Sequence, residues 1–257
     1  MRKTVLSINH VYHIYNRGVE KRKIFLDSAD YSRFISTLKH CLDYNYPYSL
    51  LNLRLKQAES PEKKQKVLLQ LETRRINPLV EIFSFCLMPN HYHLTLKQLV
   101  ENGISSFMHK IGTAYTKYFN IHQDRSGRLF ESSFKAIRVE TDEQLIHLSR
   151  YQHLNPQSLD ITKSNELVNY PWSSLSAYLK DKKFSFIKPE TVLSAFKSSK
   201  SYLNFVLGEI DKFEVLRLEK TAIDDDFSWF GNFRALKKDR QEKLRQHYIK
   251  MLLQSNY

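Results

Sequence analysis

The chain has 257 residues, 42% of them hydrophobic, which is enough to bury a core in one domain with an insert or tail, or in two small domains. Its formal net charge of +13 attracts polyanions, and it favours nucleic acid as the partner over an anionic membrane surface. No run of about 18 apolar residues is present, which argues against a membrane-spanning helix.

Two cysteines, Cys41 and Cys86, form neither a disulfide framework nor a metal quartet. We expect both to be buried, reduced thiols in a cytoplasmic protein. The first residues open no long apolar stretch, so no signal peptide is expected.

The first elements come before a long charged segment. Residues 10–16 are β-branched and aromatic, and they predict a strand that ends at Arg17-Gly18. Asp27 then precedes a helical apolar spacing that runs to residue 42, so it is the expected N-cap. From about residue 43 to 78 the sequence is charged and helix-prone, with a helix start at Ser60-Pro61. This segment is expected to be a helical insert.

The central part predicts a hairpin, a helix, a strand and a second helix. Residues 82–87 and 92–96 are strand-like and are separated by a tight connection at residues 88–90. A helix is expected over 102–119, a turn at 124–127 and a strand over 129–139. Thr141 opens a capping-box pattern, so a further helix begins there. Pro156 is expected to end it near Leu154 by pushing Asn155 out of helical dihedrals.

Two or three more helical stretches are expected beyond residue 172, the last a basic one near residues 233–253. The element order predicts an α+β fold, with an antiparallel sheet covered by helices.

The pair His91 and His93 is the first feature with chemical meaning. Side chains alternate along a strand, so both imidazoles lie on one face while Tyr92 lies on the other. Two such imidazoles can hold a divalent metal and leave positions open for substrate oxygens. Two histidines at this spacing also occur by chance on exposed strand faces.

Tyr151 and Asn155 are the second feature. They are four residues apart at the end of the predicted helix, so they lie on one face, one turn from each other. A phenol beside an amide oxygen could supply a nucleophile and one more ligand for the same metal. Packing of the tyrosine and an ordinary helix stop at Asn-Pro explain the same residues without chemistry.

Taken together, five sequence blocks in this order resemble the REP-associated tyrosine transposases, within the single-tyrosine HUH transposases. The Met-Pro-Asn-His-x-His block is the most specific of them. The blocks are Tyr12-His13-Ile14-Tyr15-Asn16-Arg17-Gly18, Phe85-Cys86-Leu87-Met88-Pro89-Asn90-His91-Tyr92-His93, Arg125-Ser126-Gly127-Arg128-Leu129-Phe130, Arg150-Tyr151-Gln152-His153-Leu154-Asn155-Pro156 and Tyr170-Pro171-Trp172-Ser173-Ser174.

The resemblance implies a role for four residues. His91 and His93 match the HUH ligands, Tyr151 matches the nucleophile, and Asn155 stands where related transposases carry a third ligand. The implied cofactor is Mg²⁺ or Mn²⁺. The implied reaction is cleavage and strand transfer of single-stranded DNA beside a hairpin, through a covalent 5′-phosphotyrosine intermediate.

The resemblance also implies a central antiparallel sheet flanked by helices (HUH, ferredoxin-like), usually as a homodimer, although a monomer is possible. The expected catalytic domain spans residues 1–180 with the insert at about 43–78. Residues 181–257 are expected to form a helical, basic C-terminal extension. Neither the insert nor the extension matches the family's compact core. A DNA-processing role places the protein at the nucleoid.

Five basic residues are candidate contacts to DNA phosphates. Generic surface charge explains each of them as well. They are Arg17, Arg125, Arg128, Lys135 and Arg138.

Three other functions stay open on the sequence. The first is a catalytically silent protein of this fold that binds hairpin DNA. The second is a metal hydrolase that uses water and leaves Tyr151 as a spectator. The third is a basic structural protein in which the His91 and His93 pair is accidental.

Overall fold

The computed structural model describes residues 4–43, 57, 59–72, 77–159, 164–179 and 184–208. Four strands form one sheet in the order β2-β3-β1-β4, with antiparallel neighbours. The strands are β1 (Val11–Arg17), β2 (Val80–Met88), β3 (His91–Gln98) and β4 (Lys135–Val139). The α-helices are α1 (Ser28–Cys41), α3 (Pro61–Glu72), α4 (Gly103–His122), α5 (Asp142–Leu154), α6 (Ser164–Val168), α7 (Leu175–Tyr178), α8 (Glu190–Leu193) and α9 (Ser199–Leu207), and the 3₁₀ turns are η1 (Val19–Lys21) and η2 (Asn155–Leu159). The predicted α+β fold is confirmed.

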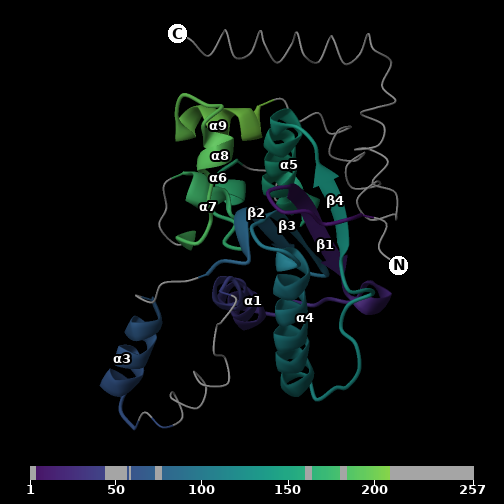
Figure 1. The fold of residues 1–257 in the computed structure, drawn as a ribbon, viewed down its shortest axis with the longest axis vertical. Helices are drawn as coiled ribbons and strands as arrows, with labels where there is room; N and C mark the ends of the chain where they lie inside the picture. The colour runs from purple at the N-terminus through teal and green to yellow at the C-terminus, as the bar shows by residue number, and fades with distance from the viewer. Residues whose placement is uncertain are drawn as a thin grey trace.

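The sheet separates two layers of helices. Figure 1 shows α1 and α4 below the sheet, and α5 above it with α8 and α9 beside α5. The pairing register sets which side chains meet on each face, because directly opposed residues point to the same side. Ile14 is opposite Leu94, and Tyr15 is opposite His93. The two central strands therefore give aliphatic and aromatic side chains to one face, and imidazoles and a phenol to the other.

The layer under α1 and α4 is a closed aromatic and aliphatic core. The ring of Phe34 packs 5.1 Å from Tyr92 and 5.0 Å from Tyr115, between ring centroids. All three side chains are buried. Burial of such large apolar surface is the main stabilising contribution in a domain of this size. This layer therefore holds the strands at a fixed register.

Local capping explains where α1 and α5 begin. The Asp27 carboxylate accepts hydrogen bonds from the backbone N–H groups of Ala29 and Asp30. The Thr141 hydroxyl accepts one from the N–H of Gln144. Each cap satisfies donors that the first helical turn leaves unpaired. Both predicted helix starts are thereby confirmed.

The predicted strand over residues 129–139 is wrong in its first half. Strand β4 begins only at Lys135, which pairs with Tyr15, whereas the next bridge joins Phe130 to Gly18. The segment between these pairs has two residues more than β1 offers, so it bulges out of the ladder. The amide of Asn16 fills the bulge, since its Nδ2 donates to the carbonyl oxygens of residues 132 and 133.

The prediction for Asn155 is also wrong. Its φ of −51° and ψ of −36° are helical, and the chain continues through η2. The residue before a proline is disfavoured in the helical region but not excluded from it. The α-helix does end at Leu154 as expected, and the helical dihedrals keep Asn155 close to α5.

Several predictions fall partly outside the described residues. In the insert, the structure gives α3, whose start is capped as expected, because the N–H of Lys63 donates to the Ser60 hydroxyl at 3.2 Å. Among the described residues after 172 there are three short helices, α7, α8 and α9, and the expected basic helix near 233–253 lies outside the described residues. Cys41 and Cys86 are buried, as predicted. Among the described helices, none combines the length and apolarity needed to cross a bilayer.

Candidate functional site

His91 and His93 lie on the face of β3 that α5 covers. Their ring centroids are 5.0 Å apart. His93 is 1% exposed, whereas His91 at the strand's first position is partly buried. Burial lowers the pKa of His91 to about 4 and lowers that of His93 well below its usual value of 6.5, and neighbouring positive charge acts in the same direction. Both imidazoles are therefore neutral at physiological pH, which is the form that binds metal.

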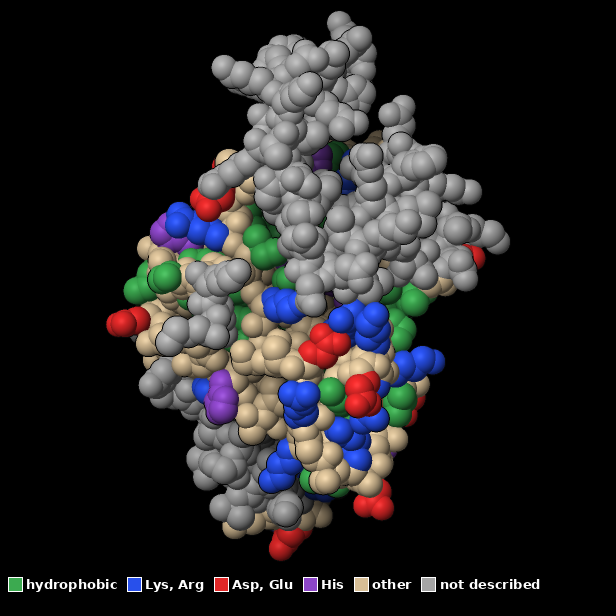
Figure 2. All heavy atoms as spheres, turned by 90° about the vertical axis from the view of Figure 1, so that its right-hand side faces the viewer, with side chains coloured by type: hydrophobic (Ala, Val, Ile, Leu, Met, Phe, Trp, Pro, Cys, Tyr) green, Lys and Arg blue, Asp and Glu red, His purple; other side chains and the backbone are tan. Residues whose placement is uncertain are grey.

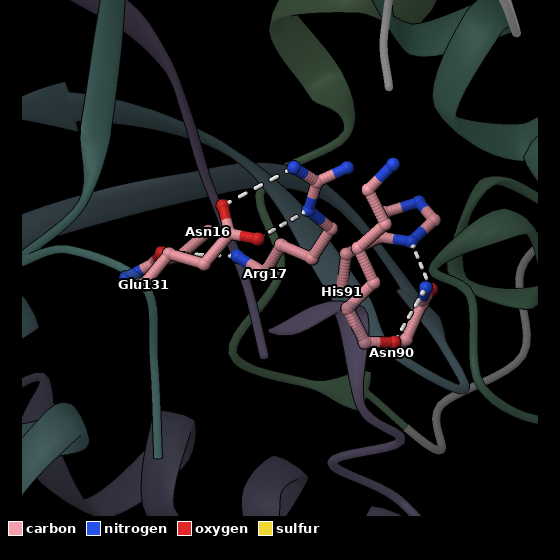
Figure 3. Close-up of polar contacts among 6 residues, drawn as sticks. Asn16, Arg17, Asn90, His91 and Glu131 are labelled. Carbon is pink, nitrogen blue, oxygen red and sulfur yellow. Dashed lines mark hydrogen bonds and ion pairs between the residues drawn. The ribbon is translucent and has the colours of Figure 1, made fainter. Parts of the chain in front are cut away.

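Each of the two imidazoles has a side-chain partner at Nδ1. His91 Nδ1 lies 2.7 Å from the Asn90 side-chain oxygen, in the turn before β3 (Figure 3). His93 Nδ1 lies 2.9 Å from Nε2 of His13 on β1. The other nitrogen of His93, Nε2, is buried and has no hydrogen-bond partner among the described residues.

The phenol ring of Tyr151 reaches this imidazole pair from α5. It stands edge-on to His93 with 5.5 Å between ring centroids, and edge-on to His13 with 6.4 Å. Its side chain is 7% exposed. Both elements belong to one chain, so the predicted nucleophile and the predicted ligands meet without a second subunit.

Buried hydrogen bonds fix the turn of α5 that carries this phenol. Ser84 on β2 donates to the Gln152 side-chain oxygen at 2.5 Å. The ring of His153 lies between the Tyr202 hydroxyl of α9, 2.7 Å from Nδ1, and the Ser174 hydroxyl, 2.8 Å from Nε2. Buried polar groups with both partners in place specify one geometry. These hydrogen bonds hold α5 against the sheet on one side and against α9 on the other.

Asn155 completes the predicted group of four. Its side chain hydrogen-bonds to the ring of His91 and thereby offsets part of the pKa lowering that burial causes. The structure therefore brings together all four residues that the sequence singled out for chemistry.

The donor set at this position fits a divalent ion. Two neutral imidazoles and an amide oxygen are ligands that Mn²⁺ accepts, and three protein ligands leave positions for substrate oxygens. The unpartnered Nε2 of His93 supports such a site, because a buried polar atom without a partner is rare in folded proteins. No cluster of three or more His, Cys, Asp or Glu side chains with metal-binding geometry occurs in the described part of the chain. The fit of a divalent ion therefore depends on the side-chain amide of Asn155 as the third protein ligand.

A second phenol lies near the same imidazoles. Tyr15 is opposite His93 across the β1–β3 pair, and its ring centroid is 6.2 Å from that of His93 and 5.3 Å from that of His13. Its position on the imidazole face makes it the alternative nucleophile that experiments must separate from Tyr151.

The five candidate DNA contacts divide between the two faces of the sheet. Arg17 is opposite His91 on the imidazole face, and its Nε lies 2.8 Å from the Glu131 carboxylate (Figure 3). Lys135 is on the same face, with its ammonium 5.9 Å from the centre of the Tyr15 ring. Both therefore lie on the face of the sheet that carries the imidazoles.

The other three basic residues lie elsewhere. Arg138 is opposite Tyr12 on the α4 side and lies 3.5 Å from Glu140. Arg125 and Arg128 line a groove of about 1060 Å³ between α4 and the loop that follows it. Lys and Arg side chains, with carboxylates among them, gather over the lower half of the face shown in Figure 2.

Sequence reasoning missed His13 and Asn90 as parts of the site. Both residues stand inside the family-like blocks, but nothing in their own spacing identifies a partner. His13 contacts His93 across 80 positions of sequence. Only the strand register reveals this contact, and the sequence does not fix that register. His13 does share the odd-numbered face of β1 with Tyr15, which is the weak pattern that could have pointed to it.

Buried histidines also predict acid sensitivity. Burial lowers the pKa of His13 and His153 from 6.5 to about 3, and that of His91 to about 4. Below about pH 6.5 the unfolded chain binds protons at these histidines, whereas the folded chain keeps them neutral until the pH approaches their lower folded pKa. The contribution of each histidine to the free energy of unfolding is therefore complete above about pH 6.5 and is lost as the pH falls toward the folded pKa. We expect the free energy of unfolding to fall by up to about 1.4 kcal/mol per pH unit for each such histidine.

Urea unfolding at several pH values measures this slope. The variant His153→Gln removes one titrating group and should flatten the slope between about pH 6 and 4. A free energy of unfolding that stays constant over this interval contradicts the expectation.

Comparison with known proteins adds a family to this geometry. Residues 62–154 match the protein family described as "Transposase IS200 like". No curated protein matches the chain. A solved structure described as "Structure of the REP associates tyrosine transposase bound to a REP hairpin" is similar, with a TM-score of 0.45 and 12% identity over 74% of this chain and 88% of that chain. The segment that carries His91, His93 and Tyr151 is therefore similar to the IS200-like transposases, which confirms the resemblance seen in the sequence motifs.

Proposed function

We propose that the protein cleaves and rejoins single-stranded DNA beside a hairpin, with Tyr151 as the nucleophile and a Mg²⁺ or Mn²⁺ ion held by His91, His93 and Asn155. The observation that carries the proposal is the edge-on contact of the Tyr151 phenol with His93, at 5.5 Å between ring centroids. A nucleophile and its metal ligands must be this close if they act on one phosphate.

The chemistry follows from the side chains present. The Tyr151 hydroxyl loses its proton and its oxygen forms a bond to phosphorus, while the bond from phosphorus to the 3′ oxygen breaks. The products are a 5′-phosphotyrosyl link and a free 3′-hydroxyl. Since one phosphodiester bond replaces another, a 3′-hydroxyl can reverse the step onto a different end. A divalent ion at His91 and His93 would polarise a phosphate oxygen and offset its developing charge.

Basic side chains on the imidazole face support the binding of a strand there. We propose that Arg17 and Lys135, which both lie on this face, contact phosphates of the bound strand. We propose that Arg125 and Arg128 contact the remaining DNA through the groove beside α4. Arg138, on the α4 side with its partner Glu140, is proposed as a peripheral contact. The hairpin as substrate rests on the sequence resemblance.

The division of the chain and its assembly are proposals as well. Residues 1–180 would form the catalytic domain with the insert at about 43–78, and residues 181–257 a C-terminal extension. Within that extension, α8 and α9 contact α5, so its first part would support the helix that carries the nucleophile. One chain holds all four active-site residues, so a homodimer would join two complete sites.

A covalent-adduct assay tests the function. The full chain is incubated with labelled, hairpin-flanked single-stranded DNA in Mn²⁺, Mg²⁺ or EDTA, and the products are separated on a denaturing protein gel. We expect labelled protein that resists denaturation in both metals and disappears in EDTA. The same strand without its hairpin should give less adduct.

Two outcomes contradict the proposal in different ways. Tight binding of the hairpin without any adduct would identify a catalytically silent DNA-binding protein. Nicked DNA without labelled protein would identify a hydrolase that uses water as the nucleophile.

A further inference from the structure

The rings of His91 and His93 both form a hydrogen bond through the same ring atom, Nδ1. The Asn90 side-chain nitrogen donates to the Lys21 carbonyl oxygen at 3.4 Å, which turns the amide oxygen toward His91 Nδ1 at 2.7 Å. An amide oxygen only accepts hydrogen bonds. The proton of the neutral His91 ring is therefore on Nδ1, and Nε2 presents a lone pair.

The hydrogen bond between His93 and His13 has two possible directions. If His13 Nε2 donated to His93 Nδ1, the proton of His93 would be on Nε2, and no lone pair would remain there for a cation. If His93 Nδ1 donates instead, the buried Nε2 presents a lone pair, and His13 acts as the acceptor. Only the second arrangement leaves His93 able to bind a cation through Nε2.

We infer that His13 and Asn90 are positioning residues of the site: each accepts the Nδ1 proton of one imidazole and so presents both Nε2 atoms as lone pairs toward the space beside Tyr151. The inference rests on the proposed function, for which it names the residues that preset the ligands. Histidine ligands in metal sites commonly donate their second ring N–H to such a partner, which fixes both tautomer and orientation. His13 is fully buried and well placed to impose one ring orientation.

Metal affinity without DNA tests the inference apart from catalysis. Mn²⁺ is titrated into the full-length protein by calorimetry. His13→Phe and Asn90→Leu remove the acceptors at similar volume, and each should raise the Kd for Mn²⁺ about 10- to 100-fold. His13→Gln and Asn90→Asp keep an acceptor oxygen, and we expect their Kd to stay within about threefold of the wild type.

The tautomers themselves give a second measurement that needs no metal. In ¹⁵N-labelled protein, two- and three-bond correlations of the imidazole protons identify the protonated nitrogen of each ring. We expect Nδ1–H for both His91 and His93 in the wild type, and loss of that preference for His93 in His13→Phe. If His13→Phe fails to fold, the Kd of His13→Gln for Mn²⁺ and the tautomers in the wild-type spectrum still test the inference.

Some results would overturn the inference. These are Nε2–H for His93 in the wild type, or an unchanged Kd for Mn²⁺ in folded His13→Phe and Asn90→Leu. A protein with the expected tautomers and metal affinities that forms no DNA adduct would overturn the proposed strand cleavage and leave this inference standing.

Discussion

Tyr151→Phe is expected to lower formation of the covalent DNA adduct by at least about 10³-fold, because the substitution removes the oxygen that attacks phosphorus. The ring itself remains, so its edge-on packing against His93 and the fold should persist. Binding of the uncleaved hairpin strand should change little. The adduct is measured on denaturing gels, and binding by fluorescence anisotropy with the same DNA.

Two matched tyrosine variants control for general damage. Tyr15→Phe alters the other phenol on the imidazole face, and Tyr118→Phe alters one on α4, across the sheet, where the Arg33 guanidinium lies 5.3 Å from the ring centre. Both should keep the adduct. Loss of the adduct in Tyr15→Phe together with its retention in Tyr151→Phe would exchange the roles of the two phenols, and mass spectrometry of the nucleotide-bearing peptide would identify the attacking residue.

His91→Ala has the second largest expected effect. It removes one of the two imidazoles and leaves an amide and a single ring, which hold a divalent ion poorly. Loss of the ion's charge stabilisation is worth several kcal/mol, so we expect the cleavage rate to fall about 10³-fold. His91 is partly exposed at the start of β3, and its removal should cost little stability. Single-turnover cleavage and the Kd for Mn²⁺ measure both consequences.

The exposed His109 of α4 offers a control for this variant, since it lies across the sheet from the imidazole face. His109 also lines the groove proposed to hold DNA, so the control is measured as metal affinity, which His109→Ala should leave unchanged. A mixture of His91→Ala with Tyr151→Phe tests whether one chain supplies both functions, as the intrachain contact supports. We expect no recovery of adduct in the mixture. Recovery would show that the phenol comes from a partner subunit.

Local sequence rules predicted the elements that place the site. The period-two alternation of strands put His91 and His93 on one face, and β3 has them there. The Thr141 cap and the spacing of four to Asn155 placed Tyr151 on the last turns of α5, where the structure has it. These rules hold because each depends on residues close in sequence.

Those local rules could not predict contacts between strands or segments of irregular backbone. Tyr15 and His13 join the site through strand register, which follows from packing of the whole sheet and not from local pattern. The bulge before Lys135 depends on the Asn16 amide, more than a hundred residues away. The helical dihedrals of Asn155 depend on the η2 turn that continues α5, against the tendency that Pro156 imposes.

The short turn between β2 and β3 has a consequence for how such a chain can change over time. Met88 pairs with His91, so only Pro89 and Asn90 join the two strands. Adding one residue in β3 between His91 and His93 would turn His93 and the side chains after it to the opposite face of the sheet, which would bring leucines to the proposed metal site and the His93 imidazole into the apolar core. The length of this stretch is therefore as strictly constrained as its residue identities, and single-residue insertions should inactivate the protein.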